Sequence, residues 1–189
     1  MDEVDRKIIT QLQLDGRTTF DKLGKMVNFS TMGAKKRVEK LLRNETIKIS
    51  AILNAKELDF HAAIVLIEVE GTDAMRNLLD RFKECPRIIH IFTTLGGYNI
   101  IALVVAENAA TLESISMEKC SLRSGKGIRR SEFYPIGEIH YSPFLLMGKR
   151  LTRKNGRVAP CGVDCRPCPK YKVKDCVGCP ATSHYIGNI

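Results

Sequence analysis

Cysteines gather near the C-terminal end of this sequence. Five of the seven lie in a single stretch with the spacing C-x3-C-x2-C-x7-C-x2-C, namely Cys161, Cys165, Cys168, Cys176 and Cys179. Two C-x2-C pairs can bring four thiolates to one point, which gives the tetrahedral S4 shell of a structural Zn2+. The first three cysteines, and the prolines that follow Cys168 and Cys179, are also typical of a [4Fe–4S] cluster.

The stretch leaves zinc, an iron–sulfur cluster and disulfides or free thiols as alternatives. No export signal opens the sequence, so we expect a cytoplasmic protein, in which clustered cysteines are metal ligands more often than disulfides. The gap between the two pairs is short for a zinc ribbon. Five thiols together with His184 exceed the four ligands of one zinc ion. Cys85 and Cys120, far away in the sequence, are predicted to be buried packing residues.

The charge is unevenly distributed along the chain. The net charge is +9, with +4 in residues 1–50, −2 in residues 51–148 and +7 in residues 149–189. Basic ends around a nearly neutral middle favour a polyanionic partner such as nucleic acid, although a solubilising surface charge gives the same total. No apolar run approaches the roughly 18 residues of a membrane span.

Residues 1–50 show the pattern of three helices. Thr18 with Asp21 predicts a capping box at the start of the second helix. Gly24 lies where a side chain is normally wanted, which indicates a closely crossing helix. The side chains expected to face inward are Val4, Ile8, Ile9 and Leu12 in the first helix and Phe20, Leu23 and Val27 in the second.

The third helix, predicted at residues 31–43, has the features of a recognition helix. Asn28 suits a left-handed turn before it. Its inner positions are apolar, whereas its outer positions carry lysines that can meet phosphates beside the major groove. A solvated basic face is the simpler alternative. The residues predicted to contact double-stranded DNA are Ser30, Thr31, Met32, Lys35, Lys36, Arg37 and Lys40.

The middle of the chain reads as strand, helix, two strands, helix and strand. The strands are expected in residues 61–70, 87–108 and 128–139, the middle range being a hairpin that turns at Gly96-Gly97. The helices are expected in residues 72–86 and 110–120. This order is that of a ferredoxin-like βαββαβ unit.

The first 48 residues resemble the DNA-binding domain of the Lrp/AsnC family of transcription regulators. The matching residues are Asp5-Arg6-Lys7-Ile8, Asp15-Gly16-Arg17, Leu23, Ser30, Arg37-Val38, Leu41 and Ile47. Two glycines of the family pattern are replaced, one by Asn28 and one by Asn44-Glu45. We expect both asparagines to adopt the left-handed backbone conformation. The resemblance implies a regulator that assembles as a homodimer or a higher oligomer.

The hairpin stretch TLGGYNII also resembles a family feature, the G-x-Y-D loop. From the residues alone, the two glycines indicate only a turn. The resemblance implies that Gly96, Tyr98 and Asn99 handle a small-molecule effector between subunits. Asn99 stands where the family has aspartate, so a carboxylate for the amino group of an amino-acid effector is missing.

Together these patterns predict an α+β chain with a winged helix-turn-helix domain, a ferredoxin-like domain and a cysteine-rich metal-binding tail. The boundaries expected are 1–50 for the DNA-binding domain, 51–60 for a linker strand, 61–143 for the effector and oligomerisation domain, 144–156 for a basic linker and 157–189 for the tail. The tail resembles a CGxxCxxCP…CxGCP module, and this resemblance does not imply a function for the tail. Its metal would be structural or would sense redox state or metal supply.

The alternative function is a metal-dependent or thiol redox enzyme with a merely structural helix-turn-helix. No nucleophile paired with a base and no carboxylate dyad is visible in the sequence. We therefore expect a regulator and not an enzyme.

Overall fold

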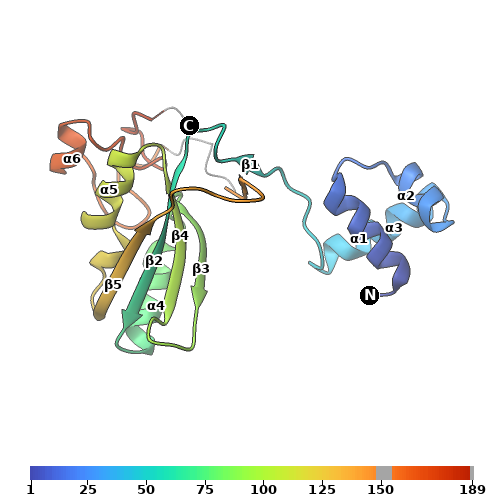
Figure 1. The fold of residues 1–189 in the computed structure, drawn as a ribbon, viewed down its shortest axis with the longest axis horizontal. Helices are drawn as coiled ribbons and strands as arrows, with labels where there is room; N and C mark the ends of the chain where they lie inside the picture. Colours follow the sequence, from blue (N-terminus) through green and yellow to red (C-terminus); the bar gives the residue numbers. More distant parts are fainter. Residues whose placement is uncertain (148–154, 188–189) are drawn as a thin grey trace. The chain divides into compact units, whose positions relative to one another are not determined.

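The computed structural model describes residues 1–147 and 155–187 and divides the chain into two compact units, Met1–Ala51 and Ile52–Ile189 (Figure 1). The predicted end of the first domain differs from this boundary by one residue. The cysteine-rich tail falls within the second unit and packs on it. Of the basic linker predicted at 144–156, residues 148–154 lie outside the described residues.

The first unit consists of α1 (Glu3–Leu14), α2 (Phe20–Val27) and α3 (Thr31–Arg43). α1 begins with a capping box in which Asp2 and Asp5 each accept from the backbone N–H of the other. All of residues 1–51 are described and none of them forms a strand, so the predicted wing is not part of this unit. The buried side chains of its core are Ile8, Leu23, Val27, Ala34, Val38 and Leu41.

Two predictions about the start of α2 were wrong. The N-cap is Thr19, whose hydroxyl accepts from the Lys22 N–H, because the Thr18 hydroxyl already donates to the Asp15 carbonyl at 2.7 Å. Phe20 is at the surface, with 36% of its area exposed, because the first turn of α2 projects beyond the core.

The second unit contains the predicted ferredoxin-like fold. The elements follow in the order β2 (His61–Val69), α4 (Thr72–Phe82), β3 (Ile88–Thr93), β4 (Ile100–Ala106), α5 (Ala109–Met117) and β5 (Ile128–Pro135), with a short 3-10 turn, η1 (Leu122–Ser124), before β5. The strands form one antiparallel sheet in the order β3-β4-β2-β5. β1 (Leu53–Asn54) pairs with β6 (Phe144–Leu145) in a separate small sheet, and α6 (Pro169–Lys172) lies in the tail.

The two faces of the main sheet differ in burial. In β2, Val65 and Ile67 are buried under α4 and α5, whereas Ile64 and Leu66, which alternate with them, are only half-buried. This period-two alternation is that of a sheet covered by helices on one side. Among the described residues, no helix is long and apolar enough to cross a membrane.

Candidate functional site

The turn between α2 and α3 fixes the direction of α3 relative to α2. Asn28 ends α2 with φ 57° and ψ 40°, the left-handed conformation predicted for it. The Ser30 hydroxyl then accepts from the Gly33 N–H at 3.1 Å and caps α3. A Cβ on Gly24 would lie 2.7 Å from the Phe29 carbonyl oxygen, closer than real Cβ contacts. A side chain at Gly24 is therefore excluded by the backbone of the turn. The prediction had given this role to a crossing helix.

The far end of α3 differs from its prediction. Asn44 follows the helix with φ −83°, and Glu45 is the residue with a positive φ, 53°. The left-handed conformation predicted for Asn44 was therefore wrong by one position. The Thr46 N–H donates to the Leu41 carbonyl at 2.9 Å, which satisfies a carbonyl of the last turn.

The outer face of α3 presents polar and basic side chains to solvent. Ala34, Val38 and Leu41 point into the core, and most of the remaining surface is open. Met32 in the first turn is 59% exposed. The exposed residues from the predicted set are Thr31, Met32, Lys35, Lys36 and Lys40, and Lys35 approaches Glu39 at 3.8 Å in an exposed pair. An exposed helical face of this kind has the dimensions that the major groove admits.

Arg37 is not part of this open face. Its guanidinium lies 2.7 Å from an Asp2 carboxylate oxygen and 3.2 Å from an Asp5 carboxylate oxygen. The Asp5 N–H, followed by the Arg37 guanidinium, holds the pKa of Asp2 below its ordinary value. A phosphate contact of Arg37 stays a prediction, because in this structure the charge of Arg37 joins α3 to the start of α1. Ser30, also predicted to touch DNA, has its hydroxyl engaged as the cap.

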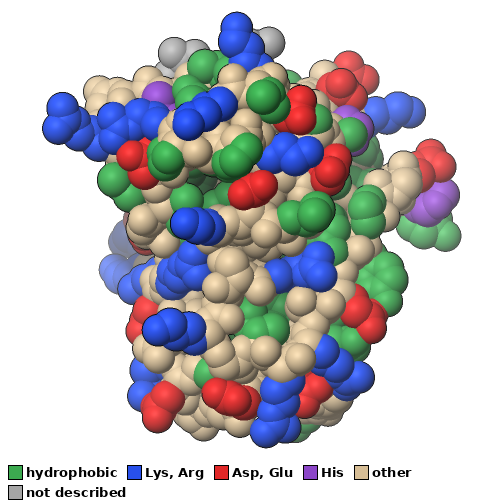
Figure 2. Space-filling view, turned by 90° about the vertical axis from the view of Figure 1, so that its left-hand side faces the viewer, with side chains coloured by type: hydrophobic (Ala, Val, Ile, Leu, Met, Phe, Trp, Pro, Cys, Tyr) green, Lys and Arg blue, Asp and Glu red, His purple; other side chains and the backbone are tan. Residues whose placement is uncertain are grey.

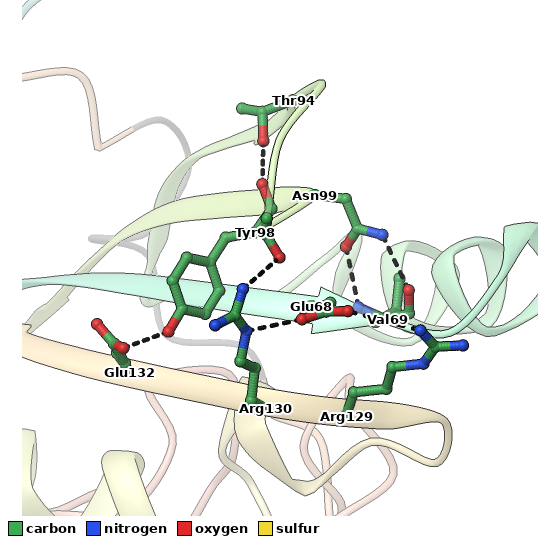
Figure 3. Close-up of polar contacts among 9 residues, drawn as sticks. Glu68, Val69, Thr94, Tyr98, Asn99, Arg129, Arg130 and Glu132 are labelled. Carbon is green, nitrogen blue, oxygen red and sulfur yellow. Dashed lines mark hydrogen bonds and ion pairs between the residues drawn. The ribbon is translucent and has the colours of Figure 1, made fainter.

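The hairpin loop between β3 and β4 holds the end of β2 through one amide. The Asn99 side chain donates to the Val69 carbonyl and accepts from the Val69 N–H, both at 2.9 Å (Figure 3). This pair of bonds needs a donor and an acceptor on the same side chain, which an amide has and a carboxylate lacks. The structure thus gives a local reason for asparagine at this position.

Tyr98 belongs to a second group of contacts on the same loop. Its hydroxyl donates to Glu132, and the Arg130 guanidinium lies over its ring at 4.4 Å. Arg130 also donates to the Gly97 carbonyl at 3.1 Å and to Glu68 at 2.7 Å, as Figure 3 shows. Of the predicted effector residues, Tyr98 and Asn99 are therefore bound to neighbouring strands, while a Cβ on Gly96 would meet only the Tyr98 carbonyl, at 3.9 Å.

The tail is attached to the second unit by contacts along its length. The Arg81 guanidinium donates to the Cys161 carbonyl at 3.2 Å, and the Val177 N–H donates to the Thr111 hydroxyl at 3.3 Å. Thr111 is fully buried in α5. These bonds come from both helices of the ferredoxin-like fold, so the tail covers the ends of α4 and α5.

A buried ion pair lies at the centre of this contact. Arg87, just before β3, pairs with Glu107, just after β4, and each side chain is 9% exposed. Arg87 also donates to the Gly178 carbonyl at 2.6 Å, and the Tyr185 hydroxyl donates to Glu107 at 2.7 Å. A buried pair is favourable when further hydrogen bonds satisfy its remaining groups, and here the tail supplies them.

All seven cysteines are free thiols, and the tail buries two of them, Cys165 and Cys176. Burial, followed by the neighbouring Cys179 thiol, raises the pKa of Cys165 to about 12, and burial raises that of Cys179 to about 11. Within the described residues, no three Cys, His, Asp or Glu side chains lie close enough to hold a single metal ion. His184 packs edge-on against the Tyr171 ring, and its Nε2 is buried without a hydrogen-bond partner in the part of the chain that the structure describes.

One prediction about the cysteines was wrong in part. Cys85 packs against the core as predicted. Cys85 and Cys120 are not far from the tail cysteines, however, because both line a cavity together with cysteines of the tail. Cys85 follows α4 and Cys120 follows α5, and the tail folds back over both positions. Cys168, placed with the other tail cysteines by its spacing, does not line this cavity.

Comparison with known protein families assigns both units. Residues 1–42 match the AsnC-type helix-turn-helix domain, and residues 62–136 match the Lrp/AsnC ligand binding domain. Together the two matches span more than half of the chain. Neither match includes residues 137–189, which contain the tail.

Curated relatives agree with this assignment. The HTH-type transcriptional regulator Rv2324 of Mycobacterium tuberculosis is 28% identical over 134 residues, covering 70% of this chain and 88% of that protein. The HTH-type transcriptional regulator FL11 of Pyrococcus abyssi is 29% identical over 119 residues, covering 60% of this chain and 76% of that protein.

Solved structures show the same fold. The structure of Escherichia coli AsnC has a TM-score of 0.66 at 21% identity and covers 75% of this chain and 95% of its own. The transcriptional regulator NMB0573 of Neisseria meningitidis, solved as an L-Met complex, has a TM-score of 0.65 at 17% identity and covers 75% of this chain and 94% of its own.

A helix-turn-helix unit followed by a ferredoxin-like ligand-binding unit defines a DNA-binding transcription regulator. The chain belongs to the Lrp/AsnC family. Its matched domains and named relatives are regulators, so the chain is not the redox enzyme considered as an alternative.

The amide at Asn99 yields a prediction with a pH signature. Asn99→Asp removes the donor to the Val69 carbonyl, and we expect a loss of about 1–3 kcal/mol in the free energy of unfolding at neutral pH. The introduced carboxyl group can donate only when protonated, so its folded-state pKa is raised. The loss should therefore shrink as the pH falls through that raised value toward the ordinary pKa of about 4. Thermal or urea unfolding across this pH range measures it.

Asn99→Ala is the matched control. It removes both bonds at every pH, so its loss of stability relative to the native chain should not vary with pH. Equal pH profiles for the two variants would show that the donor to Val69 does not matter.

Proposed function

We propose that this chain regulates transcription by placing α3 in the major groove of an operator, as a homodimer or higher oligomer acting in the cytoplasm. The observation that carries this proposal is the outer face of α3, where Lys36 and Lys40 are exposed beyond a first turn that presents Thr31 and Met32. The turn over Gly24 holds that face at a fixed angle to α2. A rigid recognition helix of this kind is the common feature of helix-turn-helix readers.

Within this proposal the contacts divide into two kinds. Thr31 and Met32 lie in the first turn, which is the part of a recognition helix that reaches base edges. The cations of Lys35, Lys36 and Lys40 neutralise phosphates and so carry affinity without sequence preference. Arg37 acts indirectly, by keeping α3 attached to α1.

Net charge alone does not single out the DNA-binding unit. Residues 1–50 carry +4, and the second unit, whose tail is basic, carries +5. On the face of the second unit that carries α5 and α6, Lys and Arg side chains alternate with Asp and Glu (Figure 2). Such interspersed charges give no continuous positive surface for a duplex.

We propose that a second copy of the chain covers the outer face of the sheet. Ile64 and Leu66 in β2 pair in register with Leu103 and Ile101 in β4, so the four side chains share one face. All four are only half-buried in the single chain, and Phe92 beside Ile101 in β3 is 55% exposed. A contiguous, partly exposed apolar sheet face is typical of a subunit interface.

For the hairpin loop we propose a place beside the effector site. The domain match to a ligand-binding module supports this, and NMB0573 was solved with L-Met. Because the amide of Asn99 is bound to Val69, residue 99 does not meet the ammonium group of a ligand. An amino-acid effector held through residue 99 is therefore not expected, and calorimetric titration with amino acids tests this point.

We also propose that the thiols of the tail bind a metal, with Zn2+ and a [4Fe–4S] cluster as the candidates. Cys161, Cys165, Cys168, Cys176 and Cys179 are the ligands that their spacing suggests. Metal–thiolate bonds would stabilise a segment that has little apolar surface of its own. This role is structural, or senses metal or redox state if loss of the metal changes DNA binding.

The central test is the substitution Lys36→Ala. Because Lys36 is assigned to a phosphate, the variant should bind all DNA sequences more weakly. The slope of log K against log salt concentration should also fall by about one. Titrations of fluorescent operator DNA at several salt concentrations measure both quantities.

Lys7→Ala is the control for total charge. Lys7 lies on α1, where it pairs with Glu3 at 2.9 Å. Lys7→Ala removes the same charge from the same unit, so the salt slope of this variant should equal that of the native chain. If the two variants changed the slope equally, net charge and not α3 would be the cause.

The interface proposal predicts that Ile101→Glu separates the subunits. A carboxylate in the centre of the apolar face would lose its hydration in the assembly. The free energy of that desolvation exceeds the free energy gained from the apolar contact. Light scattering after gel filtration should give the mass of one chain, whereas Lys119→Glu, an exposed position beyond α5, should leave the native mass. An unchanged mass for Ile101→Glu would place the interface elsewhere.

A further inference from the structure

Six of the seven cysteines line one cavity in the second unit. The cavity lies where the tail covers the ends of α4 and α5, and its volume is about 50 Å3. The sulfur-bearing residues around it are Cys85 and Cys120 from the ferredoxin-like fold and Cys161, Cys165, Cys176 and Cys179 from the tail. Their positions are up to 94 residues apart in the sequence, so the site exists only once the tail has packed.

The cavity has no evident structural purpose. The rest of its wall is largely apolar and includes Phe82, Val65 and Phe133. An empty cavity among core side chains is destabilising, because the lining atoms lose their packing partners. None of the six cysteines is in a disulfide, so cross-linking does not account for their convergence. Filling by a thiolate-bound group accounts for both features.

The arrangement fits a cluster better than a single ion. In a zinc site with Zn–S bonds of about 2.3 Å, tetrahedral geometry brings the sulfurs to about 3.8 Å from one another. Here six cysteines lie around a cavity of about 50 Å3. In an iron–sulfur cluster each thiolate binds a different iron, so the sulfurs stand farther apart around inorganic sulfide. The cavity also exceeds the roughly 10–15 Å3 that one water needs.

A buried cation lies in the wall of the same cavity. Arg87 is 7% exposed, and its positive charge acts on Cys176 and Cys179. Its bond to the Gly178 carbonyl fixes the turn between these two cysteines, where Gly178 has a φ of +83°. The second unit thus supplies both a charge and a geometric constraint to the C-x2-C pair of the tail.

We infer that this cavity binds one iron–sulfur cluster of the [4Fe–4S] type, with thiolate ligands drawn from both the tail and the ferredoxin-like fold. The inference rests on the proposed metal-binding function and changes its ligand set: Cys85 or Cys120 contributes, and Cys168 does not. Four of the six thiols ligate, each giving up its proton as it binds iron. The cluster then joins the tail to the ligand-binding domain covalently through metal–sulfur bonds.

The experiment compares iron content across matched cysteine variants of the full chain, purified without oxygen. The native chain should be brown and contain roughly four iron and four sulfide per chain. The double variant Cys85→Ala with Cys120→Ala should lose the visible absorption and contain less than one iron. The control Cys168→Ala should retain the native iron content.

Two further measurements keep the result decisive. A second double variant, Cys85→Val with Cys120→Val, fills the space that alanine leaves, and circular dichroism establishes which pair is folded. Native iron content in a folded double variant would overturn the shared site, as would a colourless native chain with one zinc. DNA titration of the same samples tests the proposed DNA binding separately. If iron is lost while operator binding is retained, the result bears only on the cluster site in the cavity.

Discussion

The path of the backbone between α2 and α3 is the constraint on which the proposed DNA binding depends. Asn28 takes a left-handed conformation, Ser30 caps the next helix, and the Phe29 carbonyl passes so close to Gly24 that no side chain fits there. These three features act together, because each permits the short turn that the others require. A longer or looser connection would let α3 vary its angle, and a recognition helix of variable angle cannot keep its first turn against base edges.

The ion pairs of Arg37 extend this constraint to α1. A cation on a recognition helix is commonly assigned to phosphate, yet here the guanidinium meets Asp2 and Asp5 at the start of α1. One end of α1 is thereby tied to the middle of α3, while apolar packing through Ile8 and Val38 holds the rest. The lysines that remain exposed, Lys35, Lys36 and Lys40, can then act on DNA without disturbing the unit that presents them.

Periodicity and capping residues were sufficient to predict most elements from the sequence. α3 begins and ends at the predicted residues, and the βαββαβ order follows from alternating apolar runs and the Gly96-Gly97 turn. What failed was of two kinds. Local choices between adjacent residues, such as Thr18 and Thr19 as the cap, depend on hydrogen bonds that a pattern does not specify. Contacts between distant residues, such as Arg37 with Asp2, have no signal in spacing at all.

The cysteines illustrate the second kind of failure most clearly. The five in the tail attracted a metal prediction because their spacing is compact, whereas Cys85 and Cys120 had no partner nearby in sequence. Only packing of the tail across α4 and α5 brings the two groups to one cavity. The contact is held by Arg87 and Glu107, a buried pair whose remaining hydrogen bonds come from Gly178 and Tyr185. A segment outside the family's matched domains has in this way become part of the ligand-binding unit.

Photo-cross-linking from the first turn of α3 tests the central claim most directly. A photoreactive amino acid in place of Met32 should join the chain to the bases of DNA from its own upstream region, because this position faces the groove. The same group in place of Lys7, on α1, should give little product. Cross-links from position 7 but not from position 32 would contradict the account, since the duplex would then lie against a different face of the unit.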